Sequence, residues 1–348
     1  MGKKLNRIWK GILIECIGIM VLAVLLLTWA ENGNEKISIE VTGQAEKEYI
    51  KWVDFTVTYE ALCKAYDWDV KTYGTEYRVG WVELLAYTAA KTGGNFDKKA
   101  LGIMDKAAKE LSRGKTTMEE LTDKLKYYPY YREAYDAAIG GLVGEFETEE
   151  GEHCYGLKGY FPLADGFDYT HYDDFGASRS YGYKRRHLGH DMMGLIGTPI
   201  TAIESGIVEA FGWNQYGGWR IGIRSFDGKR YYYYAHLRQN YPYAEGLAEG
   251  SVVTAGDVVG YMGHTGYSTQ ENVNNIEVTH LHWGLQLIFD ESQKEGNNEI
   301  WIDVYPLTRF LSKHKQKTMK VDGTKEWKRT SGIVDPLVQE YLKSKENG

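Results

Sequence analysis

Histidines and an aspartate that could bind a metal ion occur in two short segments of the sequence. In one segment, His280 and His282 alternate with apolar residues, which predicts a β-strand that carries both imidazoles on one face. Two residues along a strand span about 6–7 Å, so this arrangement suits one metal ligand beside one acid–base group. In the other segment, His187 and Asp191 are four residues apart, and Gly189 between them argues against a helix. Neutral imidazoles and a carboxylate are ordinary zinc ligands.

A third segment, residues 229–237, is rich in tyrosines, which favour strands, and it places His236 near its end. A catalytic zinc site usually has three protein ligands and keeps a fourth position for water. The three segments therefore offer three ligands and two further histidines. Each histidine taken alone is more often a surface or hydrogen-bonded residue. Their occurrence together, on strand-like segments separated by glycine turns, is what indicates a metal site.

The segment from about 185 to 290 resembles the lysostaphin/LytM-like zinc metallopeptidases. The matching motifs are, in chain order, His187-x-Gly189-x-Asp191, Gly197-Thr198-Pro199-Ile200, Ala202-x-x-x-Gly206-x-Val208, Tyr234-Ala235-His236-Leu237, Gly256-Asp257-x-x-Gly260, Gly263-x-Thr265-Gly266 and His280-Leu281-His282. The resemblance implies zinc bound by His187, Asp191 and His282. It also implies that His236 and His280 are the catalytic histidines.

This ligand set predicts a hydrolytic mechanism. Zinc would polarise its water and the scissile carbonyl, and His280 would act as the general base and pass the proton to the leaving amine. His236 would stabilise the transition state or share the proton transfer. The predicted activity is that of a zinc metalloendopeptidase, a hydrolase, and the resemblance implies peptidoglycan stem peptides or cross-bridges as its substrates.

Further residues near the motifs are expected at the substrate groove: Tyr234, His190, His264 and Tyr267. On a strand, His190 has the opposite parity to His187 and Asp191, so it is expected to lie near the metal without binding it. The polar loop 267–279 is longer than the family pattern and is expected to rim the groove, where it would affect substrate preference. The basic run at residues 184–186 is expected to form a groove edge.

The N-terminal segment has the pattern of a signal anchor. Four basic residues lie within residues 1–10, and an apolar run follows at residues 11–30, broken only by Glu15. Twenty residues of helix span about 30 Å, the thickness of one bilayer core. Basic residues before the run and acidic residues after it predict a single-pass protein of the cell membrane, with a cytoplasmic N-terminus and an extracytoplasmic catalytic domain. A cleaved signal peptide is the alternative, but no clear small-x-small cleavage site follows the run.

The chain as a whole is expected to have an α+β fold in four parts. These are residues 1–36 with the transmembrane helix and the start of a stalk, 37–150 as a helical domain, 151–320 as an antiparallel β, LytM-like metallopeptidase domain with a groove, and 321–348 as a charged tail. In the second part, helices are predicted at 81–91, at 98–111, after a capping box at Thr117 and Glu120, and at 131–146.

One stretch of the helical part, residues 84–95, resembles the end of the catalytic helix of lysozyme-like transglycosylases. That motif needs a glutamate as general acid, and Lys91 occupies the position. A lysine cannot replace a carboxylic acid of raised pKa, so no glycosidase activity is expected. The helical part is expected to form a small core, and an envelope protein is a candidate partner for its surface.

Composition limits the remaining possibilities. The 348 residues carry a formal net charge of −7, which gives no sign of nucleic-acid binding. The sequence has no C-x-x-C motif, and Cys63 and Cys154 are expected to be free thiols, although a disulfide between them is the alternative. Two other functions remain open. The first is a non-catalytic scaffold of the same fold that binds a wall peptide or an envelope protein, and the second is a peptidase that acts on an exported protein.

Overall fold

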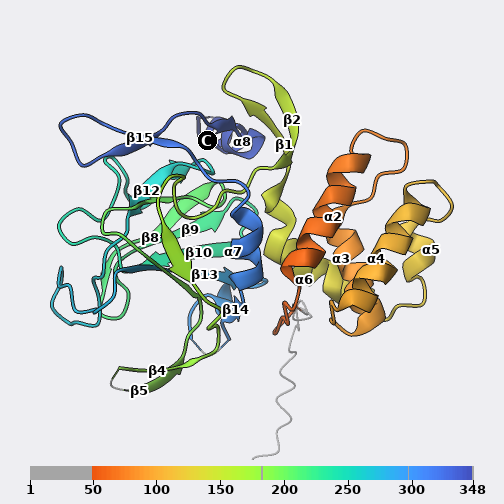
Figure 1. Cartoon of the computed structure of the whole chain (residues 1–348), viewed down its shortest axis with the longest axis horizontal. Coiled ribbons are helices and arrows are strands. Elements are labelled where there is room, and N and C mark those ends of the chain that lie inside the picture. The colour runs from red at the N-terminus through yellow and green to blue at the C-terminus, as the bar shows by residue number, and fades with distance from the viewer. Residues whose placement is uncertain (1–48, 182, 297, 347–348) are drawn as a thin grey trace, which may run out of the picture. The chain divides into compact units, whose positions relative to one another are not determined.

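The computed structural model describes residues 49–181, 183–296 and 298–346 (Figure 1). The predicted transmembrane run at residues 11–30 lies outside this part of the chain. Among the described residues, no helix is both long enough and apolar enough to cross a membrane. These residues belong to one compact unit, Tyr49–Gly348.

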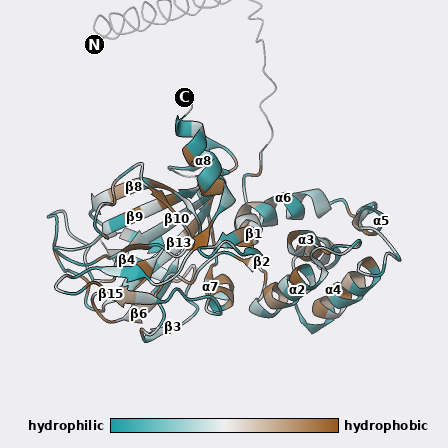
Figure 2. Cartoon of the chain, turned by 90° about the horizontal axis from the view of Figure 1, so that it is seen from above, coloured by the Kyte–Doolittle hydropathy of each residue, from teal (hydrophilic) through white to brown (hydrophobic). Residues whose placement is uncertain are grey.

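Five helices make up the first part of this unit. They are α2 (Tyr59–Thr72), α3 (Trp81–Thr92), α4 (Lys98–Leu111), α5 (Met118–Thr122) and α6 (Tyr128–Ile139). The helices predicted at residues 81–91 and 98–111 are confirmed, and α5 begins with the predicted capping box of Thr117 and Glu120. In Figure 2 the helices carry both hydrophilic and hydrophobic positions, as expected when one face of each helix packs against a core.

The last helix of this part differs from its prediction. A helix was expected over residues 131–146, but α6 ends at Ile139. The next two residues are glycines, and a Cβ on Gly141 would lie 1.8 Å from Glu204 Oε1. A residue with a side chain would not fit at position 141, and strand β1 begins two residues later. Three strands pair here, namely β1 (Val143–Thr148), β2 (His153–Leu157) and β17 (Ile333–Val334).

The second part is built on an antiparallel sheet, as predicted. Its order is β11-β8-β9-β10-β13-β6-β3, and β14 pairs with β13 beside β6. The strands are β3 (Tyr169–His171), β6 (His190–Gly194), β8 (Gly206–Asn214), β9 (Gly218–Ser225), β10 (Arg230–Ala235), β11 (Val252–Val253), β13 (His280–Leu287) and β14 (Ile300–Ile302). Strand β10 carries four tyrosines, and β8 and β9 carry isoleucines and a valine, which are residue types that suit a pleated, half-buried surface.

Three two-stranded sheets and two helices complete the fold. Two of these sheets are hairpins, β4 (Ser178–Tyr181) with β5 (Tyr183–Arg186) and β15 (Thr318–Lys320) with β16 (Trp327–Arg329), and the third pairs β7 (Pro199–Thr201) with the distant β12 (Val258–Tyr261). The helices are α7 (Tyr305–Leu311) and α8 (Pro336–Glu346). The hairpin β4–β5 extends away from the sheet (Figure 1). The region predicted as a charged tail contains strand β17, which pairs with β1, and helix α8.

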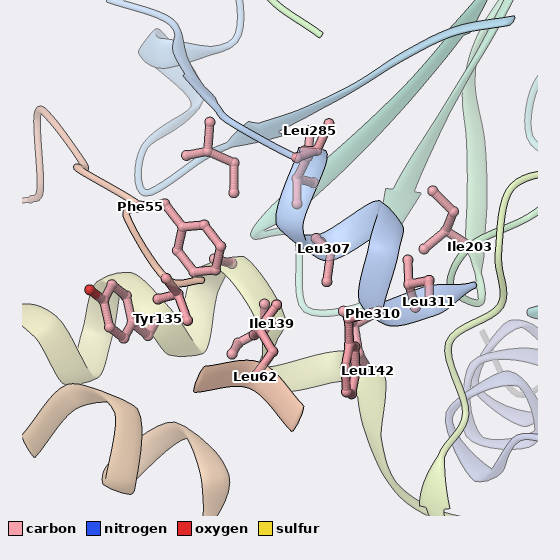
Figure 3. Close-up of a cluster of buried hydrophobic side chains, with 14 of the residues drawn as sticks. Phe55, Leu62, Tyr135, Ile139, Leu142, Ile203, Leu285, Leu307, Phe310 and Leu311 are labelled. Atoms are coloured by element: carbon pink, nitrogen blue, oxygen red, sulfur yellow. The ribbon is translucent and has the colours of Figure 1, made fainter. Parts of the chain in front are cut away.

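The helical part and the sheet share one hydrophobic core (Figure 3). Phe310 of α7 is fully buried, and its ring lies 5.5 Å from that of Tyr66 in α2 and 5.9 Å from that of Trp81 in α3. Leu142, which directly precedes β1, and Leu285 of β13 belong to the same cluster. Helix α7 thus joins the packing of the helices to that of the sheet. Cys63 and Cys154 are free thiols, as expected.

Candidate metal centre and active site

The pairing of β6 with β13 brings the predicted metal ligands together. Asp191 and His282 are direct partners in this antiparallel pair, and His187 lies in the segment that leads from β5 into β6. Asp191 Oδ1 lies 3.0 Å from His187 Nε2 and 2.9 Å from His282 Nδ1, and the two nitrogens are 3.0 Å apart. Gly189 allows this approach, because a Cβ there would lie 2.6 Å from the His282 ring. Three ligand atoms therefore converge on one point.

The protonation of these groups fits a divalent cation such as zinc. Burial lowers the pKa of His282, so its ring is neutral near pH 7. Burial would raise the pKa of Asp191, but hydrogen bonds from His187 and His282 lower it more, and the carboxyl group is ionised. Burial would lower the pKa of His187, but its contact with Asp191 raises it, so binding a cation would displace a proton. Two imidazoles and one carboxylate are a suitable donor set for zinc.

Asp174 orients His187. The hydrogen bond from His187 Nδ1 goes to the Asp174 backbone carbonyl at 3.3 Å, and Asp174 Oδ1 lies 3.1 Å from the same nitrogen, on the side of the ring that faces away from the metal ligands. Metal-binding histidines commonly donate their second nitrogen to such a group, which fixes the tautomer. Arg179 of β4 contacts Asp174 and also lies 3.3 Å from Asp191 Oδ2. Sequence reasoning missed both residues, since no motif spacing links them to the histidines and only folding brings them near.

The two further histidines lie next to the ligand cluster. The rings of His236 and His280 are 4.7 Å apart, and His280 Nε2 lies 3.7 Å from Asp191 Oδ1. Each ring has its Nδ1 at a backbone carbonyl, 2.9 Å from Thr265 O for His236 and 2.8 Å from Val278 O for His280. A carbonyl only accepts, so Nδ1 carries the hydrogen in both rings and Nε2 of each neutral ring is unprotonated. Burial lowers the pKa of His236 well below its ordinary value.

A cavity of about 300 Å³ lies over this cluster. The three predicted ligands and the two further histidines line this cavity. The other side chains that line it include Arg179, Arg185, Arg186, Tyr216, Tyr233, Tyr267, Glu299 and Trp301. Tyr267 was predicted at the groove and lines the cavity. Of the run at residues 184–186, predicted at the groove edge, Arg185 and Arg186 line the cavity and Lys184 does not. The rings of Tyr233 and Trp301 are 6.2 Å apart, and that of Tyr233 is 6.1 Å from His282. The cavity thus has aromatic walls beside the metal ligands.

Three residues expected at the groove lie elsewhere. Tyr234 is fully buried on the other face of β10, where its hydroxyl accepts a hydrogen bond from the Ile203 amide at 3.0 Å. His190 is buried on the opposite face of β6 from Asp191, and burial lowers its pKa to about 3. His264 donates from Nδ1 to Ile276 O at 2.7 Å. None of the three lines the cavity, and for Tyr234 and His190 strand parity is the reason.

Several known proteins resemble this chain. Residues 185–295 match Peptidase family M23. The L-Ala--D-Glu endopeptidase of Bacillus subtilis is 31% identical over 205 residues, which are 57% of this chain and 57% of that protein. Lysostaphin of Staphylococcus simulans is 38% identical over 89 residues, 25% of this chain and 17% of that protein. The glycyl-glycine endopeptidase ALE-1 of Staphylococcus capitis is 35% identical over 94 residues, 27% of this chain and 25% of that protein. The chain thus spans little more than half the length of the first relative.

Solved structures give corresponding matches. A LytM protein of Ruminococcus gnavus has 26% identity, and the match covers 76% of this chain and 95% of that one with a TM-score of 0.48. The catalytic domain of lysostaphin has 30% identity, with 40% of this chain and 92% of that domain covered and a TM-score of 0.32. The sequence match and the converging motif residues lead to one conclusion. Residues 185–295 belong to a domain of peptidase family M23, homologous to lysostaphin and to the L-Ala--D-Glu endopeptidase.

Proposed function

We propose that this chain is a zinc metalloendopeptidase that hydrolyses peptide bonds in peptidoglycan. The observation that supports this most directly is the convergence of His187, Asp191 and His282 within about 3 Å of one another, beside two further histidines. The names of the M23 relatives include both L-Ala--D-Glu and glycyl-glycine endopeptidases. A scaffold with no catalysis would not need five such residues around one cavity.

The chain's own groups suit peptide hydrolysis. Zinc, when bound by His187, Asp191 and His282, supplies a Lewis acid for the attacking water and the scissile carbonyl. The unprotonated Nε2 of His280 takes the proton from the water and returns it to the leaving amine. His236 has the same tautomer and a lowered pKa, so it too accepts a proton and cannot donate one from Nε2 beforehand. This favours shared proton transfer over hydrogen-bond donation to the carbonyl oxygen.

We also propose that residues 11–30 anchor the chain in the cell membrane, with the peptidase domain outside. The charge pattern around this run supports the proposal, as does the extracytoplasmic position of peptidoglycan. Recovery of the intact chain in the soluble fraction of lysed cells would contradict it.

The peptidase proposal is tested with the purified full chain, zinc, and a panel of stem peptides and cross-bridge peptides. New amino termini should appear with zinc and disappear with a chelator. His282→Ala should lose the metal and the activity together. His280→Ala should keep zinc but lose roughly 10²- to 10⁴-fold in rate, because it removes only an acid–base group.

The matched control is His153→Ala, because His153 is an exposed histidine of β2 far from the motifs in sequence. It should keep both zinc and activity. Full zinc occupancy in His282→Ala would contradict the ligand assignment. If the zinc-loaded chain binds wall peptides but cleaves none, the result would favour the non-catalytic scaffold. If it cleaves only peptides that do not occur in peptidoglycan, the result would favour a peptidase that acts on exported proteins.

A further inference from the structure

Three arginines line the cavity over the metal ligands, and they are not equally paired. Arg179 is held by Asp174 and Asp191. Arg185 and Arg186 have no carboxylate within ion-pair distance among the described residues. The remaining acid of the cavity wall, Glu299, accepts a hydrogen bond from Trp301 Nε1 at 2.7 Å. A chain of net charge −7 thus places two guanidinium groups without a carboxylate partner among the described residues at its candidate active site.

Arg185 is the more firmly positioned of the two. Its guanidinium carbon lies 4.9 Å from the centre of the Tyr267 ring and 5.6 Å from that of Tyr216, and Nη2 contacts the Tyr267 hydroxyl. Its Nε is buried and has no hydrogen-bond partner among the described residues. Arg186, in contrast, is exposed. Aromatic contacts fix the direction of a cation, whereas a buried donor without an acceptor is unfavourable.

The position of Arg185 is close to the reacting groups. The Tyr267 ring, which Arg185 contacts, lies 6.0 Å from the His236 ring, and His236 lies beside His280. One aromatic ring therefore separates the Arg185 guanidinium from the two histidines proposed to transfer protons. A group bound by Arg185 would belong to the residue next to the scissile bond or to one close to it.

The two bond types named for the M23 relatives differ in what they offer this arginine. A glycyl-glycine bridge is neutral along its length. In an L-Ala–γ-D-Glu peptide, the carbon attached to the scissile nitrogen carries a free α-carboxylate. Guanidinium groups present a planar set of donors that matches a carboxylate with two hydrogen bonds. Only the second substrate would satisfy the unpaired donors of Arg185.

We propose that Arg185 is a carboxylate-binding, specificity-determining residue, and that the substrate is a stem peptide with a free carboxylate beside the scissile bond. This inference rests on the peptidase function proposed above and selects among its substrates. A neutral glycine bridge would leave Arg185 without a carboxylate and its buried Nε without an acceptor, and is a poor substrate for this groove.

The test compares two peptides with the zinc-loaded full chain. One is L-Ala–γ-D-Glu–L-Lys–D-Ala, and the other is the same peptide with the glutamate α-carboxylate replaced by an α-amide; pentaglycine with an acetylated amino terminus and an amidated carboxyl terminus is added as a neutral reference. The carboxylate peptide should have the higher kcat/KM by roughly 10- to 100-fold, as expected for a hydrogen bond to a charged group. The difference should lie mainly in KM, because the contact does not change during the reaction.

Variants of the basic run identify the residue responsible. Arg185→Gln should bring the ratio of the two kcat/KM values close to one, and Arg185→Lys should give an intermediate ratio, since it keeps the charge but not the planar donors. Lys184→Gln is the matched control, because it removes one charge from the same strand and Lys184 does not line the cavity. It should keep the full preference.

Binding to the metal-free chain separates this inference from the proposed function. Calorimetry should show tighter binding of the carboxylate peptide, and this preference should disappear in Arg185→Gln. If calorimetry shows this preference but no peptide is cleaved in the presence of zinc, the result supports carboxylate binding by Arg185 and contradicts the proposed peptidase function. Cleavage of both peptides at equal kcat/KM, or a preference lost in Arg186→Gln but kept in Arg185→Gln, would overturn the inference.

Discussion

His236 has an unusual backbone conformation for a non-glycine residue, with φ at +62°. The surrounding structure holds it there, because its N–H donates to Gly217 O at 2.7 Å and its carbonyl accepts from the Gly263 N–H at 3.0 Å. The left-handed residue ends β10 and turns the ring toward His280. Such residues cluster at functional sites, where the fold compensates for local strain. Strand pattern alone could not predict this turn.

His190 gives a prediction about pH at the residue scale. Its pKa in the fold is about 3, because the ring is buried, whereas an unfolded histidine titrates near 6.5. Between these values the unfolded chain binds more protons than the folded chain. The stability contributed by neutral His190 is therefore present above about pH 6.5 and is lost, at up to about 1.4 kcal/mol per pH unit, as the pH falls toward 3.

Urea unfolding of the metal-free chain at pH 7.0 and pH 5.5 measures this effect. His190→Gln keeps a side chain that can bond to His171, which lies 2.8 Å from the native ring, but it does not titrate. The variant should lose less free energy of unfolding than the unmodified chain over this interval. Equal losses in both chains would show that His190 is not responsible.

At the scale of elements, Arg230 connects helix α6 to strand β10. It is almost fully buried, and its Nε and Nη2 donate to the two oxygens of Glu204 at 2.7 and 3.1 Å. Its Nη1 donates to the carbonyls of Asp136 and Ala137 at the end of α6, at 3.2 and 3.0 Å. The Asp136 carbonyl also accepts from the Gly140 N–H, so the arginine adds a second donor there and one at Ala137, in the last turn of α6.

Arg230→Met should lower the free energy of unfolding by about 3–5 kcal/mol, because it leaves Glu204 buried without its counter-ion. Adding Glu204→Gln should restore part of the loss. The control is Arg132→Met, whose ion pair with Glu83 is partly exposed and should contribute no more than about 1 kcal/mol. Denaturant unfolding checks all three, and similar losses at both arginines would contradict the assigned role.

Sequence reasoning succeeded for elements whose side chains repeat with a period. Strand β13 was predictable because His280 and His282 alternate with buried apolar residues. The same reasoning could not tell which side chains of β10 face the cavity, because four consecutive tyrosines show no alternation. Tyr234 was therefore predicted at the groove, whereas Tyr233 lines the cavity. Asp174 and Arg179 could not be predicted, because their roles depend on contacts with His187 and Asp191 that only the folded chain makes.

At the scale of the whole molecule, the shared core predicts one cooperative unfolding transition. Buried residues of α2, α3, α6, α7 and β13 belong to one cluster (Figure 3). Scanning calorimetry of the full chain should therefore give a single peak, with equal calorimetric and van't Hoff enthalpies. Phe310→Ala should shift this peak to lower temperature as a whole, at a cost of about 3–5 kcal/mol. Two separate peaks, with only one moved by the substitution, would contradict a common core.

Helix α7 has a further consequence for how this protein can be recombined with others. Its buried face contacts rings of α2 and α3, so the sheet that carries the candidate metal ligands does not have a closed apolar surface of its own. A graft that moved only residues 151–346 into a foreign chain would expose the side of Phe310 that now meets the helices. A chimera should keep its solubility only if residues 49–150 are transferred together with residues 151–346, or if the new host supplies a complementary apolar face.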